Sequence, residues 1–339
     1  MPTKSKKKEL AVPRPSSSVV LISPENEVLL LHRVKTSTSF ASAHVFPGGN
    51  ISVRHDGEFS MPPEDPRRHY DAINYRRAAI RELFEESGIL LARDATNPRR
   101  LVHVDEAGRE KGRHDIHNNK IGFREWLKQQ SSTAEMDTDN LIPFTHWITP
   151  PNLPKRFSTQ MYLYFLPIPD SSTGSESTAQ GLPEGGRQEV QVPTSDGGVE
   201  INEARFLTAS DWLRQARAGE IILYPPQFLL LSIVAQFLDK STSPAATSTE
   251  KQARRKELLD FIYSGNPSWT DKFVCPRSLQ LLDDQRAVLA LDHPGPELDG
   301  SGKKGDDERV ILVKFGKDGP RNVDVRWKRD VLREEKSSL

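Results

Sequence analysis

The chain contains 339 residues, which is enough for one large domain or two of ordinary size. Its 47 Lys and Arg residues balance 47 Asp and Glu residues, so a globally basic surface for nucleic acid is excluded. The single cysteine, Cys275, excludes a disulfide framework and a cysteine-based zinc cluster, and is typical of a reducing compartment. We therefore expect an intracellular protein, cytoplasmic by default, with the peroxisome or mitochondrion as alternatives.

Composition divides the chain into three parts. Residues 1–16 are expected to form a disordered basic tail, because a lysine run is followed by two prolines. Residues 17–240 form the predicted main domain, with insertions near 52–70 and 171–198, and residues 241–339 form an extension made of a linker, a helix and a hairpin. No membrane span is expected, since the most apolar stretch, 221–238, is interrupted by two prolines.

The hydrophobic pattern predicts both strands and helices. Apolar runs at 18–23 and 28–32 predict a β-hairpin, and the polar region 94–115 is predicted to be a loop. Further strands are expected at 144–149, 157–166, 200–207 and in a hairpin at 309–327, and helices at 71–87, from 211, at 223–239 and at 250–263. This order predicts an α/β fold, a sandwich with a mixed sheet, followed by a small α+β extension.

The predicted helix that ends before Gly88 carries two opposite stripes. At about 100° per residue, Ile80, Leu83 and Phe84 share one face. Three glutamates, Glu82, Glu85 and Glu86, share the other. Like charges at this spacing repel by a few tenths of a kcal/mol per pair. The stripe is therefore either a solvated acidic face or a platform for a hard divalent cation such as Mg²⁺.

The sequence around this helix favours the metal site. Phe46-Pro-Gly-Gly49 precedes the helix, and such a turn lets a ligand approach the backbone closely. Together with R-E-L-F-E-E-S-G-I at 81–89, it resembles the box of the Nudix hydrolase superfamily, G-x5-E-x7-R-E-U-x-E-E-x-G-U. The second half matches in full. The first half departs from the pattern, because Gly49 stands about thirty residues before Arg81 and Ile73 occupies the place of the early glutamate.

Further segments resemble the long-insert acyl-coenzyme A diphosphatase branch of this superfamily. They are Leu29-Leu-Leu-His-Arg33, Ala43-His-Val-Phe-Pro-Gly-Gly49, Trp147-Ile-Thr-Pro, Lys155-Arg-Phe157 and Tyr224-Pro-Pro-Gln-Phe228. The related coenzyme A signature also has a second arginine and a glycine between the strand and the Gly-Gly turn, and residues 37–43 lack both. Histidines 32, 44 and 146 lie beside these segments. Each has either a structural role or a contact with substrate, and the sequence does not decide between the two.

The resemblance implies a Nudix-like α/β/α sandwich, a Mg²⁺ or Mn²⁺ cofactor and a set of roles. Glu85 and Glu86 would be metal ligands, and Glu82 a ligand or the base that orients the attacking water. The carbonyl of Gly48 would complete the metal shell, and Arg81 would hold the carboxylates in place. A later acidic ligand would be Glu200, six residues before Phe206, with Glu203 as the alternative. The residues implied in substrate binding are Arg33, Gly49, Lys155 and Arg156.

The implied function is metal-dependent hydrolysis of the diphosphate bond in coenzyme A, acyl-coenzyme A or a related nucleoside diphosphate-linked small molecule. Metal ions would neutralise the diphosphate and activate a water, which needs no covalent nucleophile. Two alternatives stay open. One is a Nudix hydrolase of ADP-ribose-like or capped-RNA substrates, and the other is a Nudix-fold module that binds a ligand without hydrolysing it.

Overall fold

The computed structural model describes residues 10–34, 40–168, 201–239 and 246–337. Among these residues, eight strands form a central sheet in the order β10-β2-β1-β9-β8-β11, with β3 on β2 and β4 on β1. The strands are β1 (Arg14–Ile22), β2 (Val28–Arg33), β3 (His44–Val45), β4 (Gly48–Asn50), β8 (Ile142–Ile148), β9 (Phe157–Phe165), β10 (Ile201–Leu207) and β11 (Phe273–Val274). The sheet is mixed, because β1 and β9 are parallel whereas β8 and β9 are antiparallel.

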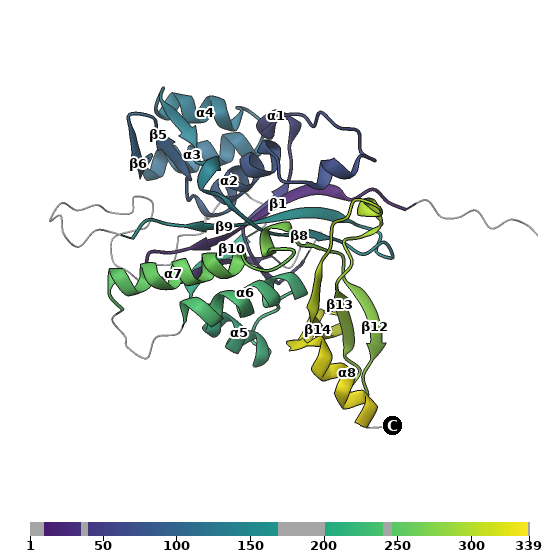
Figure 1. Cartoon of the computed structure of the whole chain (residues 1–339). Coiled ribbons are helices and arrows are strands. Elements are labelled where there is room, and N and C mark those ends of the chain that lie inside the picture. The colour runs from purple at the N-terminus through teal and green to yellow at the C-terminus, as the bar shows by residue number, and fades with distance from the viewer. Residues whose placement is uncertain (1–9, 35–39, 169–200, 240–245, 338–339) are drawn as a thin grey trace, which may run out of the picture.

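Helices cover both faces of this sheet (Figure 1). One layer contains α1 (Val53–Asp56), α2 (Ile73–Ser87), α3 (Glu106–His117) and α4 (Phe123–Gln130). The other contains α5 (Ala209–Arg217), α6 (Pro225–Leu238) and α7 (Ser248–Ile262). The predicted α/β/α sandwich is therefore confirmed. Beside the first layer, β6 (Asn97–Leu101), β5 (Ala92–Asp94) and β7 (Ala134–Met136) form a small separate sheet.

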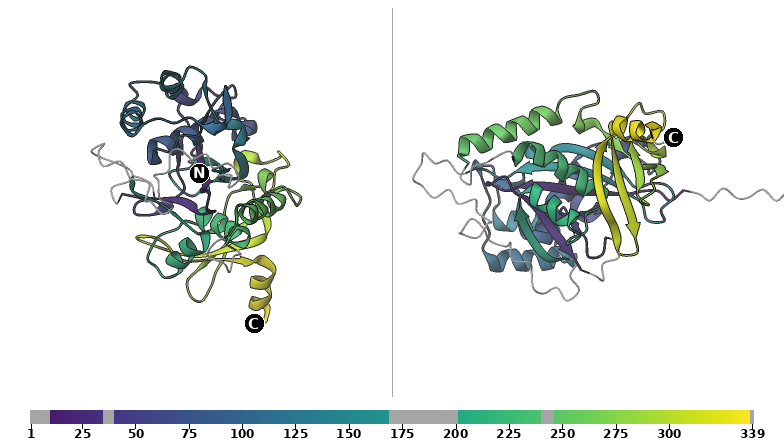
Figure 2. Two further views of the ribbon diagram at one scale, coloured as in Figure 1. Left: turned by 90° about the vertical axis from the view of Figure 1, so that its left-hand side faces the viewer. Right: turned by 90° about the horizontal axis from the view of Figure 1, so that it is seen from below.

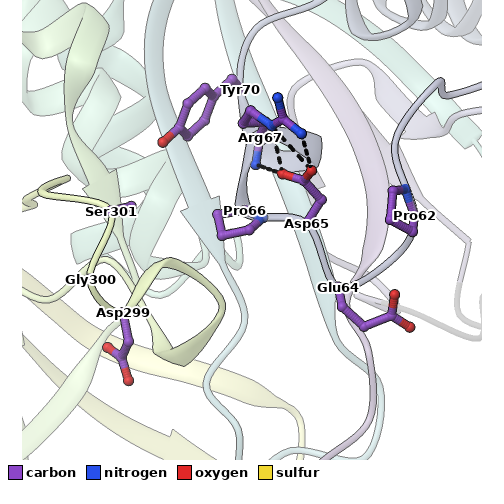
Figure 3. Close-up of a pocket in the computed structure, with 9 residues that line it drawn as sticks. All are labelled: Pro62, Glu64, Asp65, Pro66, Arg67, Tyr70, Asp299, Gly300 and Ser301. Carbon is purple, nitrogen blue, oxygen red and sulfur yellow. Dashed lines mark hydrogen bonds and ion pairs between the residues drawn. The ribbon is translucent and has the colours of Figure 1, made fainter.

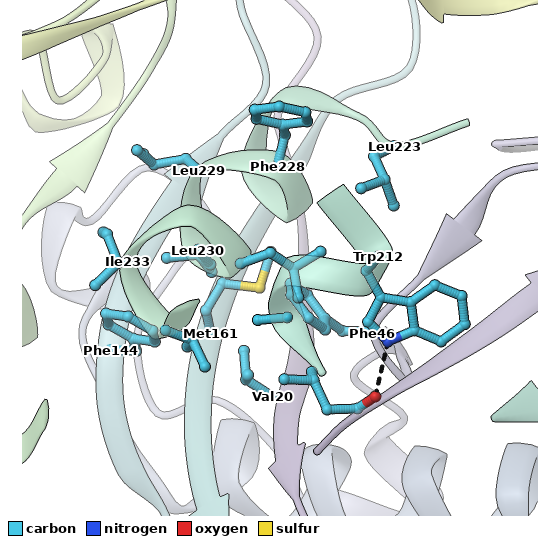
Figure 4. Close-up of a cluster of buried hydrophobic side chains, with 14 of the residues drawn as sticks. Val20, Phe46, Phe144, Met161, Trp212, Leu223, Phe228, Leu229, Leu230 and Ile233 are labelled. Atoms are coloured by element: carbon cyan, nitrogen blue, oxygen red, sulfur yellow. Dashed lines mark hydrogen bonds between the residues drawn. The ribbon is translucent and has the colours of Figure 1, made fainter. Parts of the chain in front are cut away.

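Alternation along the strands divides the buried side chains into two cores. Leu29 and Leu31 of β2 point toward α2 and join one cluster, whereas Val28 and Leu30 join the other. Figure 4 shows the second cluster, where Leu230 of α6 and Phe144 of β8 lie near Met161 of β9. Side chains of opposite parity on one strand thus face different helix layers, which decides where each polar residue of β2 lies.

Several elements differ from the sequence-based expectation. The first two strands meet at a single register pair, Ile22 with Val28, because β1 pairs along its length with β9 and at its start with β4. The strand β1 begins at Arg14, inside the expected tail. The region 94–115, expected to be a loop, contains β6 and most of α3, whose first turn is capped by the Asp105 side chain. The expected insertion 171–198 lies outside the described residues.

The C-terminal extension contains more structure than the expected helix and hairpin. The hairpin is β14 (Asp306–Gly316) with β15 (Gly319–Trp327), and it belongs to a four-stranded sheet that also contains β12 (Arg277–Leu281) and β13 (Ala287–Leu291). This second sheet ends in α8 (Lys328–Ser337), and Figure 2 shows it beside the α6 layer. The short strand β11 joins the central sheet beside β8. No helix in the described part of the chain is long and apolar enough to cross a membrane.

Candidate functional site

The glutamate stripe of α2 lies against protein, not in bulk water. Ile80, Leu83 and Phe84 are fully buried beneath the helix and hold it on the sheet. On its other side, the exposed fractions of the Glu82, Glu85 and Glu86 side chains are 16%, 10% and 9%. The helix ends where Gly88 adopts a left-handed conformation and its N–H bonds the carbonyl of Phe84. Three carboxylates are therefore concentrated in one partly enclosed place.

The Gly-Gly turn lies directly against these carboxylates. Gly48 and Gly49 belong to β4, where they pair with Ser18 and Ser17 of β1. The Gly48 N–H donates a hydrogen bond of 2.8 Å to Glu86. A Cβ on Gly49 would lie 2.5 Å from the carboxyl carbon of Glu82, so any larger residue would collide with it. The structure thus brings together the two motif halves that are separated in sequence.

Arg81 connects the stripe to the rest of the fold. Its Nη1 donates to Glu82 at 2.8 Å and to Glu85 at 2.9 Å. Its Nε and Nη2 donate to the two carboxylate oxygens of Asp56 at 3.0 and 2.8 Å. Nη2 also bonds the carbonyl of Asn50, next to the glycine turn, at 2.9 Å. The guanidinium therefore fixes two of the glutamates relative to the turn.

Asp56 is a site residue that the sequence reasoning missed. Its side chain is fully buried at the end of α1, and it also accepts a hydrogen bond from the Ser52 N–H. Counted forward from Gly49, the motif's early acid falls at position 55, one residue before Asp56. Ile73, which stands where backward counting from Arg81 puts that acid, begins α2 and is 46% exposed. Forward counting was the signal that could have found Asp56.

The charges of the stripe are only partly compensated by the protein. Burial raises the pKa of Glu82 to about 7, in spite of its ion pair with Arg81. Burial acts the same way on Glu85, but hydrogen bonds from His117 and Arg81 outweigh it and lower the pKa of that carboxyl. The two guanidiniums of Arg81 and Arg33 cannot neutralise the three glutamates together with Asp56. The donor set, with carboxylate oxygens beside an open backbone turn, fits a hard divalent cation.

Two further side chains surround the carboxylates. Arg33, at the end of β2, lies 3.6 Å from Glu86. His117, at the end of α3, lies 3.5 Å from Glu85, and its side chain is 54% exposed. His117 was not expected from the sequence, because its segment was predicted to border a loop. Both can present positive charge or hydrogen-bond donors at the edge of the site.

The remaining predicted residues have other surroundings. Arg156 is buried and donates hydrogen bonds to the carbonyls of Thr149 and Ala11, besides an ion pair with Glu297 of the extension. Lys155, its neighbour, is exposed. Glu200 lies outside the described residues. Glu203 lies on β10 opposite His32, whose side chain points away from the α2 layer.

A wide depression lies elsewhere on the molecule (Figure 3). It is lined by residues of the 52–70 insertion, including Arg67 and Tyr70, and by the loop at Asp299–Ser301 of the extension. Asp65 and Arg67 pair with each other there. The depression therefore marks the junction of insertion and extension, and the glutamate stripe is not part of it.

Comparison with known proteins supports the motif. The chain is 27% identical over 227 residues to "Putative nudix hydrolase 7" of Caenorhabditis elegans, a match that covers 67% of this chain and 62% of the relative. It is 24% identical to the acyl-coenzyme A diphosphatase NUDT19 of Xenopus laevis, over 62% of this chain and 60% of that protein. The chain therefore resembles Nudix hydrolases over about two thirds of its length. It spans about three fifths of the length of these curated relatives.

A solved structure resembles this chain to a smaller degree. The Nudix hydrolase from Alicyclobacillus acidocaldarius is 20% identical, with a TM-score of 0.49 over 69% of this chain and 98% of the other. No family model matches the sequence. In this chain the acid that pairs with Arg81 is Asp56, which lies near the start of the insertion that separates the two halves of the motif.

Proposed function

We propose that the protein is a Mg²⁺- or Mn²⁺-dependent diphosphatase that hydrolyses coenzyme A, acyl-coenzyme A or a related nucleoside diphosphate-linked compound. One observation carries the proposal. Three partly enclosed carboxylates lie against a Gly-Gly turn, where the buried Asp56–Arg81 pair holds Glu82 and Glu85 and the Gly48 N–H holds Glu86. An arrangement that merely solvated an acidic helix face would need neither the glycine nor the buried arginine.

The residues of the site suggest a division of work. Glu85 and Glu86 would hold the metal, which would neutralise the diphosphate and lower the pKa of a bound water. Glu82, whose carboxyl lies beside Gly49 and accepts a hydrogen bond from Arg81, would be either a third metal ligand or the base that orients the attacking water. Arg33, 3.6 Å from Glu86, would contact a phosphate oxygen. Gly49 would let the diphosphate approach the backbone.

The proposed reaction is a simple hydrolysis. Water forms a bond to one phosphorus of the diphosphate while the bridging P–O bond breaks, and two phosphate monoesters leave. From coenzyme A, the products would be adenosine 3′,5′-bisphosphate and a phosphopantetheine. The relative named acyl-coenzyme A diphosphatase supports this substrate class over ADP-ribose-like or capped-RNA compounds.

The test is a substrate panel with purified protein in Mg²⁺ or Mn²⁺. Release of adenosine 3′,5′-bisphosphate from coenzyme A or an acyl-coenzyme A supports the proposal. Turnover of ADP-ribose or capped RNA, without turnover of coenzyme A compounds, would contradict this substrate class and support the alternative substrates. Binding without any turnover would support a non-catalytic module.

The metal site is tested by conservative substitution. Glu85→Gln and Glu86→Gln are each expected to lower kcat at least 100-fold while leaving the circular dichroism spectrum unchanged. Glu125→Gln, at an exposed position on α4, is the matched control and should keep full activity. Near-normal rates in both site variants would overturn the assignment of these carboxylates.

A further inference from the structure

A second cluster of metal-ligating side chains lies on the opposite face of the sheet from the glutamate stripe. His32, His44 and Glu203 stand on β2, β3 and β10, and one potential ligand atom of each lies within 4.8 Å of the others. The register explains this, since His32 is paired directly with both other residues across the strands. Cross-strand partners on one face hold their side chains within contact distance.

The two imidazoles form a close stack. Their ring centroids are 4.6 Å apart and their planes differ by 4°. His44 is buried, and its Nδ1 has no hydrogen-bond partner among the described residues. A buried polar atom without a partner costs stability. A bound ion would supply the partner that this nitrogen lacks. Burial also lowers the pKa of His44 to about 4, so the ring is neutral and able to bind a metal at pH 7.

We propose that His32, His44 and Glu203 form a binding site for a transition-metal ion of the Zn²⁺ class. Two imidazole nitrogens and one carboxylate are a ligand set that Zn²⁺ uses in proteins, whereas Mg²⁺ requires oxygen ligands. The site therefore differs in chemistry from the proposed Mg²⁺ or Mn²⁺ site. It also does not depend on the proposed diphosphatase activity.

Binding requires a local rearrangement. Stacked parallel rings cannot both direct a nitrogen lone pair at one ion, so at least one ring must rotate about its Cβ–Cγ bond. His32 is the half-buried member, and it has the greater room to do so. Glu203 must also exchange its ion pair with Arg205, at 3.4 Å, for the metal. Arg205 thus opposes binding, both by competing for the carboxylate and by repelling a cation.

The ion would connect three neighbouring strands close to the Gly-Gly turn. His44 begins β3, four residues before Gly48, and its backbone N–H bonds the carbonyl of Ile222 before α6. Its ring also lies 5.5 Å from the indole ring of Trp212. Figure 4 shows Trp212 inside the α6-side cluster. This contact supplies a spectroscopic signal for an ion at His44.

The first experiment titrates the full chain with Zn²⁺ in excess Mg²⁺ and measures binding by calorimetry. We expect one Zn²⁺ per chain, with affinity at least 10-fold weaker in His32→Ala and in Glu203→Gln. Arg205→Gln should bind more tightly. His114→Ala, which removes an exposed histidine of α3, is the matched control and should bind as the wild type does. Equal affinity in the wild type, His32→Ala and Glu203→Gln would overturn the proposal.

A second measurement avoids variants of the buried histidine. Paramagnetic Ni²⁺ or Cu²⁺ bound at the site should quench part of the tryptophan fluorescence, and Trp212→Phe should lose that part. Quenching that persists in Trp212→Phe would place the ion elsewhere. Glu85→Gln should lose turnover and keep zinc binding. His32→Ala should lose zinc binding and keep turnover. The two proposals can therefore fail separately.

Discussion

The buried pair between Asp56 and Arg81 gives the sharpest test of how the site is held. The exposed fractions of the two side chains are 0% and 5%. Breaking a buried ion pair by removing one charge costs about 3–5 kcal/mol. In Asp56→Asn, Arg81 keeps its hydrogen bonds to Glu82 and Glu85, so we expect the lower end, about 3 kcal/mol. At roughly 2 °C per kcal/mol, Tm should fall by about 6 °C.

The same substitution should weaken metal binding. Without Asp56, Arg81 is drawn more strongly to the glutamates that would hold the ion, and loss of such an outer partner costs about 10–100-fold in affinity or activity. Thermal unfolding and the Mg²⁺ dependence of turnover measure the two effects. Asp260→Asn, which removes an exposed pair with Lys256, is the matched control. An unchanged Tm and Mg²⁺ requirement in Asp56→Asn would refute the reasoning.

A double variant asks whether sequence position or geometry decides the role of this acid. Ile73→Glu restores the glutamate that the motif prescribes eight residues before Arg81. Because residue 73 is 46% exposed at the start of α2, its carboxylate should not replace Asp56. Ile73→Glu combined with Asp56→Asn should therefore be as impaired as Asp56→Asn alone. Recovery of stability and activity in the double variant would mean that position 73 reaches Arg81.

Three further substitutions test other parts of the fold. Gly49→Ala should lower kcat more than 10-fold with little change in secondary structure, because its Cβ would lie 2.5 Å from the Glu82 carboxyl; normal kinetics would contradict that collision. Glu297→Gln should cost about 3 kcal/mol in urea unfolding, since it leaves a buried arginine without its counter-charge, and an altered KM would instead indicate that this arginine serves the substrate. Burial lowers the pKa of His146 to about 3, so the unfolded chain takes up a proton below pH 6.5 more readily than the folded one. The free energy of unfolding is therefore unaffected by His146 above pH 6.5 and falls as the pH drops toward 3, by about 2 kcal/mol at pH 5. His146→Gln should remove the contribution of His146 and leave that of His44, so that the loss of stability between pH 6.5 and pH 5 becomes smaller; an unchanged acid limb would contradict it.

The central motif was predictable because its information is local. Periodicity places Ile80, Leu83 and Phe84 on the buried face of α2, and the structure confirms it. The Gly48–Glu86 hydrogen bond then follows from the family resemblance, which already brings the glycine turn to the helix. Helix periodicity and a dense motif are properties of a few consecutive residues, so they can be recognised without knowledge of the fold.

Long-range partners were not predictable in the same way. Arg156 looked suited to contact a phosphate, yet it pairs with Glu297, which is 141 residues away. The region that supplies Glu297 was expected to be a small extension. Strand pairing was unpredictable for the same reason, since β1 pairs in parallel with β9, which lies far along the chain. Such contacts depend on topology, and an isolated charged residue carries no information about it.

The split motif retains its geometry because α2 holds the insertion at several points. Asn74 donates hydrogen bonds to the carbonyls of Gly57 and Glu58, and Tyr75 donates one to the carbonyl of Arg68. A longer loop costs little extra closure entropy, about 0.6 kcal/mol for each doubling of its length. The early acid can therefore lie at either end of the insertion, as long as its carboxylate reaches Arg81. Conservation of that contact, and not of a residue spacing, is what the structure requires of this motif.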